Sequence, residues 1–210
     1  MVLAGQFLER PALVACGELT LEGLYHRGRR APALLVCPPL DGGGMDAAAV
    51  AELAWASARA GHPSLRFQHR GIGASQGEAD LAFAVEDAAA ALAHLAEGGP
   101  GLVAAAGVGS GCATALALAA RAPRALCGLA LIAPPVGALA GGKARALPML
   151  LLLPEGGRAP RRGTLPAGAR FERVPGADAA VRSGLPAMGR SVAAWLESLE
   201  SLGPRRSPRR

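Results

Sequence analysis

Short apolar segments of strand length alternate with alanine-rich helical segments along most of this chain. The predicted strands span 11–17, 19–26, 33–37, 63–67, 102–106, 126–133, 149–153 and 170–174, and the predicted helices span 45–60, 81–95, 111–121 and 187–200. Strands that are joined through helices run parallel and are covered on both faces, so they read as nearly continuous apolar runs. The alternation therefore predicts an α/β domain with a mostly parallel sheet of about seven to eight strands, helices on both faces and an N-terminal antiparallel hairpin.

A glycine-framed segment, Gly107-Val108-Gly109-Ser110-Gly111, follows one predicted strand and opens a helix. This is the layout of the nucleophile elbow of hydrolases, G-x-S-x-G, in which the nucleophile occupies the central position. In that frame the central residue is Gly109. If Ser110 were the nucleophile, the β-branched Val108 would flank it, and valine fits poorly in so crowded a turn. We therefore place the frame on position 109 and predict that Ser110 lies at or next to the helix N-cap, where serine is favoured.

Three further segments, 24–26, 34–46 and 65–78, complete a recognisable pattern, and Arg70-Gly71-Ile72-Gly73-x-Ser75-x-Gly77 is its most distinctive part. From about residue 11 to 200 the chain resembles small bacterial α/β hydrolases. Within that superfamily it is most similar to the short, lidless group of predicted serine hydrolases of the serine aminopeptidase or esterase type. The resemblance implies the α/β-hydrolase fold without a cap domain, although a fold does not by itself imply an activity.

The resemblance also indicates where catalytic residues would stand. Such enzymes need a serine on the elbow, an acid after a late strand and a histidine in the last loop. These positions are occupied here by Gly109, Gly157 and Ala179, with Glu155 close enough to the second position to be an alternative acid. No histidine follows His94, so the usual order of serine, acid and histidine cannot form. We therefore expect no conventional catalytic residue.

The loop after the strand at 33–37 contains Pro39, Leu40 and Asp41 where the family has its oxyanion loop. An ionised Asp41 would oppose the negative charge that such a loop stabilises, unless its carboxylate points to solvent. Ligands of parallel α/β sheets bind at the carboxyl ends of the strands. We expect Pro39, Leu40, Asp41, Gly109 and Ser110 to line a ligand cleft there.

The sequence is compatible with three functions. The first is a catalytically degenerate hydrolase-fold protein, a pseudoenzyme, that binds a partner protein or a small acyl-type ligand in its cleft. The second is an active esterase or thioesterase that uses Ser110 with a non-standard base such as His69, which follows a strand near the pocket. The third is nucleotide binding at Lys143, but Ala144 lacks the hydroxyl that a P-loop offers to Mg²⁺, and we interpret this segment as a loop.

The spacing of the cysteines and the character of the apolar segments favour a reducing, cytoplasmic compartment. Cys16, Cys37, Cys112 and Cys127 are irregularly spaced, with no pairing typical of a metal site, so we expect reduced thiols and neither a metal nor a cofactor. Cys112 is predicted to be a buried packing residue rather than a reactive thiol. Since neither a signal peptide nor a membrane span is evident, we expect a cytoplasmic bacterial protein.

The positive charge is concentrated at the C-terminus. The formal net charge is +6, and Arg205, Arg206, Arg209 and Arg210 contribute four of these charges. We predict a single domain over 1–202 followed by a basic, disordered tail at 203–210. No aromatic residues are interleaved with these arginines, so we do not expect nucleic acid binding. The partners to consider are a protein, a small molecule, or further copies of this or a related chain.

Overall fold

The computed structural model describes residues 9–99, 101–135, 137–138, 147–157 and 169–200. The strands are β1 (Glu9–Cys16), β2 (Leu19–His26), β3 (Ala33–Cys37), β4 (Ser64–Phe67), β5 (Val103–Val108), β6 (Leu126–Ile132), β7 (Met149–Pro154) and β8 (Arg170–Val174). The helices are α1 (Ala48–Arg59), α2 (Ala84–Gly98), α3 (Gly111–Arg121) and α4 (Leu185–Glu200), and short 3₁₀ turns, η1 (Gly44–Asp46) and η2 (Leu81–Phe83), precede the first two.

Within the described ranges, the strands form one sheet of eight in the order β1-β2-β4-β3-β5-β6-β7-β8. The hairpin strands β1 and β2 pair antiparallel with each other, and β2 pairs antiparallel with β4. All the other neighbouring strands are parallel, from β4 through β3 to β8. The predicted fold class is confirmed, including the N-terminal hairpin and the number of strands.

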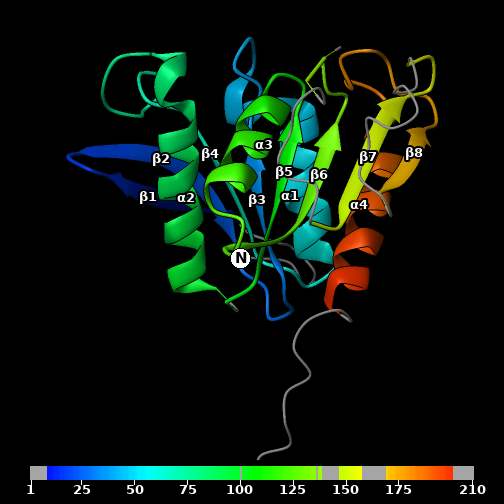
Figure 1. Ribbon diagram of the computed structural model, residues 1–210, viewed down its shortest axis with the longest axis horizontal. Helices are drawn as coiled ribbons and strands as arrows, with labels where there is room; N and C mark the ends of the chain where they lie inside the picture. The colour runs from blue at the N-terminus through cyan, green and yellow to red at the C-terminus, as the bar shows by residue number, and fades with distance from the viewer. Residues whose placement is uncertain (1–8, 100, 136, 139–146, 158–168, 201–210) are drawn as a thin grey trace, which may run out of the picture.

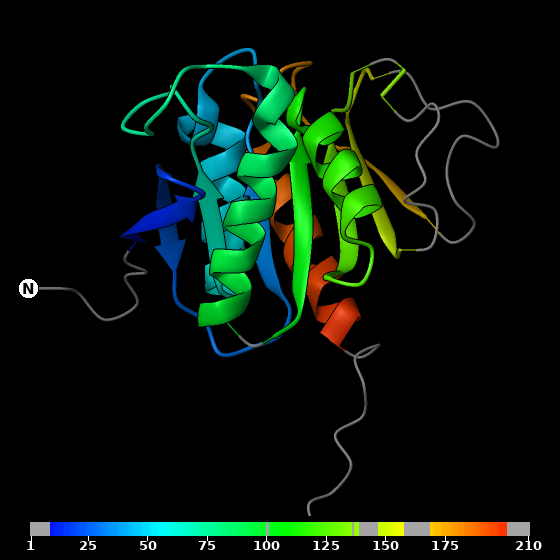
Figure 2. The same ribbon diagram turned by 60° about the vertical axis from the view of Figure 1, so that its left-hand side comes forward.

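Two pairs of helices cover the two faces of the sheet (Figures 1 and 2). Helices α2 and α3 share one apolar cluster with Leu35, Leu131 and Leu151, whereas α1 and α4 share the other with Leu34 and Leu152. Successive strand side chains point to opposite faces, so Leu34 and Leu35 enter different clusters. This is why each central strand is an unbroken apolar run.

Some helix boundaries differ from those predicted. The helix expected over 45–60 begins as η1, and α1 starts only at Ala48, because Gly43 and Gly44 adopt positive φ values of 72° and 51° at its entrance. The helix expected over 81–95 likewise starts with η2 and extends to Gly98. Lys143 and the predicted tail at 203–210 lie outside the described residues. Among the helices in the described ranges, none has the length and apolarity needed to cross a membrane.

The register of the central strands determines which loops meet. Cys37 of β3 pairs with Gly107 of β5, and Val108 of β5 pairs with Ile132 of β6, so the loops that follow these three strands emerge side by side. After β3 the chain crosses to β4 on one side of it, and after β4 it returns to β5 on the other side. Such a reversal of strand order is where open α/β sheets bind ligands.

Candidate functional site

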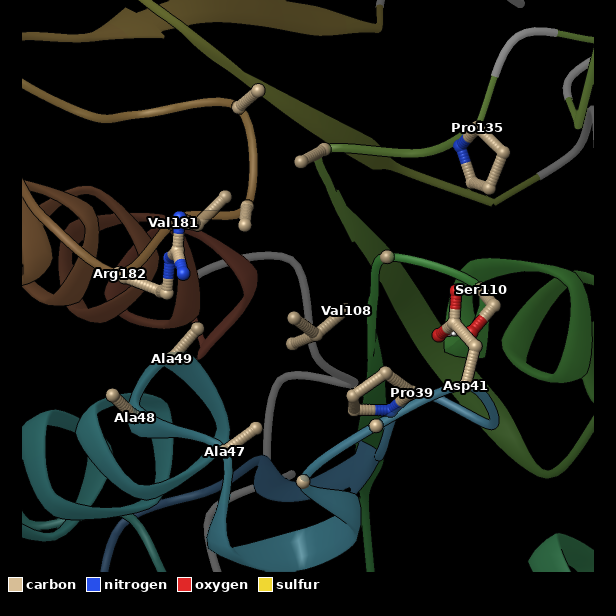
Figure 3. A pocket seen from close by; sticks show the side chains of 16 residues that line it. Pro39, Asp41, Ala47, Ala48, Ala49, Val108, Ser110, Pro135, Val181 and Arg182 are labelled. Carbon is tan, nitrogen blue, oxygen red and sulfur yellow. Dashed lines mark hydrogen bonds between the residues drawn. The ribbon is translucent and has the colours of Figure 1, made fainter.

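A pocket of about 550 Å³ opens at this reversal, at the carboxyl ends of the strands (Figure 3). Its volume lies within the range of roughly 300–1,000 Å³ that is common for small-molecule sites. Four loops and the start of α1 supply its walls, which are mostly apolar. The lining residues are Pro39, Asp41, Gly42, Gly43, Ala47, Ala48, Ala49, Val108, Gly109, Ser110, Ala133, Pro135, Ala179, Ala180, Val181 and Arg182.

Gly109 lies between β5 and α3 with φ +56°, in the left-handed region that strains any residue with a side chain. A Cβ at Gly109 would meet only the Cβ of Pro39, at 3.8 Å. By contrast, a Cβ at Gly107 would lie 2.6 Å from the Cα of Cys112, and one at Gly111 would overlap the carbonyl oxygen of Pro38. The turn therefore has room for a side chain at its central position, 109, and none at positions 107 and 111, as the elbow frame on position 109 requires.

Ser110 occupies the N-cap position of α3, but its side chain does not cap the helix. Its Oγ donates a hydrogen bond to Oδ1 of Asp41 at 2.5 Å and accepts one from the backbone N–H of Leu40 at 2.8 Å. The predicted position of Ser110 at the helix N-cap is confirmed, but its hydroxyl does not make the capping hydrogen bond for which serine is favoured there. The register between β3 and β5 brings the loop of Leu40 and Asp41 within reach of the Ser110 hydroxyl. Both hydrogen bonds of that hydroxyl are therefore made with this loop.

The oxyanion donors of an α/β hydrolase are the backbone N–H after the nucleophile and an N–H from the loop after β3. In this chain the N–H of Leu40 already donates to Ser110, and the carboxylate of Asp41 lies beside it. Leu40 is not among the residues that line the pocket, contrary to the expectation from sequence. The turn therefore presents a negative charge where an oxyanion would need donors.

The acid position, Gly157, lies in the turn after β7, where its backbone groups form hydrogen bonds that hold the turn. Its carbonyl accepts a hydrogen bond from Arg173 at 2.6 Å, and its N–H donates to the carbonyl of Pro154 at 2.9 Å. Oε2 of Glu155, the alternative acid, accepts a hydrogen bond from the N–H of Gly176 at 2.9 Å. Neither Gly157 nor Glu155 lines the pocket.

The histidine position, Ala179, does line the pocket and adds only a methyl group to its wall. Its neighbour Asp178 holds the loop after β8: Oδ1 accepts the backbone N–H of Arg182 at 2.6 Å, and Oδ2 accepts Nε of Arg182 at 3.1 Å. The backbone N–H of Arg182 and its guanidinium together hold the pKa of Asp178 below its ordinary value. This carboxylate thus shapes the pocket wall instead of orienting a histidine.

His69 lies after β4 and is buried against Asp87 of α2. Its Nδ1 lies 3.3 Å from Oδ2 of Asp87, whose two oxygens also accept hydrogen bonds from the backbone N–H and the Nε of Arg70, at 3.0 and 2.8 Å. Burial raises the pKa of Asp87, but these hydrogen bonds outweigh it and leave the pKa below its ordinary value. Within the described part of the chain, Nε2 of His69 has no hydrogen-bond partner, so the structure does not pair this ring with Ser110.

The thiols are not activated. Cys112, just inside α3, is fully buried, and its Sγ points to the carbonyl oxygens of Gly107 and Ile132. Burial raises its pKa well above the ordinary value, and it raises the pKa of Cys37 to about 12. The packing role predicted for Cys112 is confirmed.

The family model for serine aminopeptidase, S33, matches residues 33–161, more than half of the 210 residues. The chain belongs to the serine aminopeptidase S33 family. The match covers β3 through β7, including the elbow and the loop of Asp41. No curated protein matches the sequence of this family member.

Solved structures show the same fold at low sequence identity. One is a protein of unknown function from Agrobacterium tumefaciens, 23% identical over 96% of this chain and 100% of that one, with a TM-score of 0.71. An α/β serine hydrolase homologue from Coxiella burnetii is 22% identical over 93% and 99% of the two chains, with a TM-score of 0.70. A serine hydrolase without a lid from Xanthomonas campestris is 18% identical over 99% and 100%, with a TM-score of 0.70.

Part of the pocket of this S33 family member could not be found from sequence. Ala133 and Val181 line it with positive φ values of 47° and 52°, a backbone conformation that non-glycine residues rarely adopt. Neither an alanine nor a valine signals such a position in a sequence. Arg182 was also missed, because a single arginine in a loop is ordinary.

Proposed function

We propose that this S33 family member is a catalytically degenerate hydrolase that binds a ligand in its former active-site pocket. Of the ligands considered, a small acyl-type molecule fits better than a partner protein, because the site is a concave pocket with apolar walls. The observation that carries the proposal is Gly109, which has the backbone conformation of the elbow nucleophile and no side chain.

The expected loss of activity is large. In a serine protease, removing the nucleophile or the histidine lowers turnover on the order of a millionfold, and the oxyanion donors provide most of what remains. Here glycine and alanine stand at the nucleophile and histidine positions, and the Leu40 N–H is engaged by Ser110. Ligand binding does not need the reacting groups of the triad, because it depends only on the walls of the pocket.

The alternative of an active esterase with Ser110 and His69 has weaker support. A base must lie within hydrogen-bond reach of the proton that it removes. The hydroxyl of Ser110 donates to Asp41, and the ring of His69 faces Asp87. Both groups would have to leave these partners and approach each other.

Hexanamide, a neutral acyl compound, tests the proposal. We expect it to perturb the backbone amide NMR signals of pocket residues, while p-nitrophenyl butyrate is not turned over above the buffer rate. Ala179→Trp should weaken hexanamide binding about tenfold or more, since excluding two methylenes from the pocket costs about 1.6 kcal/mol. Ala93→Trp, at another exposed alanine on α2 away from the pocket, is the matched control and should bind normally.

Two results would overturn this form of the proposal. One is the absence of hexanamide binding by the wild-type protein. The other is saturable hydrolysis of the ester that Ala179→Trp abolishes and Ala93→Trp preserves.

A further inference from the structure

We infer that the ligand of this pocket carries a protonated amine that lies against Asp41, an inference that rests on the proposed binding function. The basis is an imbalance of charge between the two sides of the pocket.

Among the described residues that line the pocket, only Asp41 and Arg182 have acidic or basic side chains. Arg182 is already paired, since its Nε contacts Oδ2 of Asp178 at 3.1 Å. Asp41 has no cationic partner among the side chains that the structure describes, and its hydrogen bond comes from the neutral hydroxyl of Ser110. Within the described part of the chain, Asp41 is therefore the one carboxylate of the pocket that no cationic side chain pairs with.

The position of this carboxylate determines where a ligand's charge would lie. Asp41 and Ser110 lie together at the elbow side of the pocket, and Arg182 lies across it (Figure 3). The bond from Ser110 fixes one carboxylate oxygen of Asp41 and leaves the other able to accept a hydrogen bond. An ammonium group there could donate to Asp41 while its alkyl portion packs along Val108 and Ala179.

The same charge disfavours carboxylate ligands. Asp41 is exposed, so its interactions are those of charges near water, where a unit charge at 4 Å gains or loses about 1 kcal/mol, or about fivefold in affinity. Among three ligands with the same six-carbon tail, the affinity should decrease from hexylammonium to hexanamide to hexanoate. The cation and the anion should differ by about twenty-five-fold at low ionic strength, and by less in high salt.

The experiment measures dissociation constants of these three probes by NMR titration at neutral pH for the wild type, Asp41→Asn and Glu78→Gln. Asparagine retains an oxygen that accepts from Ser110, so Asp41→Asn removes the charge and keeps the hydrogen bond. We expect this variant to reduce the difference between hexylammonium and hexanoate to about threefold or less. Glu78→Gln, which removes an exposed charge away from the pocket, should retain the wild-type difference.

The outcomes separate the two proposals. If hexanamide binds but the wild type does not prefer the cation, or if Asp41→Asn keeps the preference, the inference about charge is wrong and the binding function stands. If none of the three probes binds, the binding function itself fails.

Discussion

Replacing Gly111 by alanine is expected to lower the free energy of unfolding by about 3 kcal/mol, and replacing Gly109 by alanine by only about 1 kcal/mol. A Cβ at Gly111 overlaps the carbonyl oxygen of Pro38, and backbone cannot move aside as a flexible side chain can. At Gly109 the nearest atom is 3.8 Å away, so the main cost is the positive φ. Gly107→Ala should resemble Gly111→Ala, because its Cβ would lie 2.6 Å from the Cα of Cys112.

Urea unfolding of the three alanine variants and the wild type measures these costs. The three glycines belong to one turn, so each variant is a control for the others. A larger cost at Gly109 than at Gly107 and Gly111 would mean that position 109 is not the open central position of an elbow.

The second large effect is expected at Asp87. Asp87→Asn should reduce the free energy of unfolding at neutral pH by about 3 kcal/mol, because it leaves the largely buried guanidinium of Arg70 without its counter-charge and weakens the hydrogen bond with the ring of His69. The carboxylate is fully buried and accepts hydrogen bonds from both residues. Glu86 lies beside Asp87 on α2, and its carboxylate is 3.5 Å from Arg70 but half exposed. Glu86→Gln should therefore lower the free energy of unfolding by less than about 1 kcal/mol.

This contribution should depend on pH in a defined direction. The pKa of Asp87 is lower in the folded protein than its ordinary value, so the unfolded chain binds more protons as the pH falls. The stabilisation is complete above the ordinary pKa of aspartate, about 4, and is lost as the pH falls through the folded value. Chemical unfolding from neutral pH to below pH 4 should therefore show the wild type converging on Asp87→Asn. A difference that stays constant over that range would contradict this assignment.

The parts of the fold that sequence predicted well depend on local patterns. The apolar run predicted as a strand over 102–106 is β5, and the turn after it accepts only glycine at 107 and 111, where a Cβ would meet backbone atoms. The predicted pocket residues Pro39, Asp41, Gly109 and Ser110 do meet, because each directly follows a central strand.

The contacts that sequence did not predict join distant segments. Ser110 hydrogen bonds with Asp41, 69 positions away, and capping was the better local explanation for a serine at a helix start. His69 pairs with Asp87 on α2, a partner that depends on how the helix packs against the sheet. No local pattern fixes such pairs, since they are decided by strand register and helix packing.

We propose that the elbow of this S33 family member has no nucleophile, because Gly109 occupies its central position. Treatment with a fluorophosphonate probe, which labels activated serines, tests it most directly, with an active serine hydrolase as the positive control and Ser110→Ala beside the wild type. We predict that neither the wild type nor Ser110→Ala is labelled under conditions that label the control completely. Stoichiometric labelling of the wild type that Ser110→Ala abolishes would contradict the account.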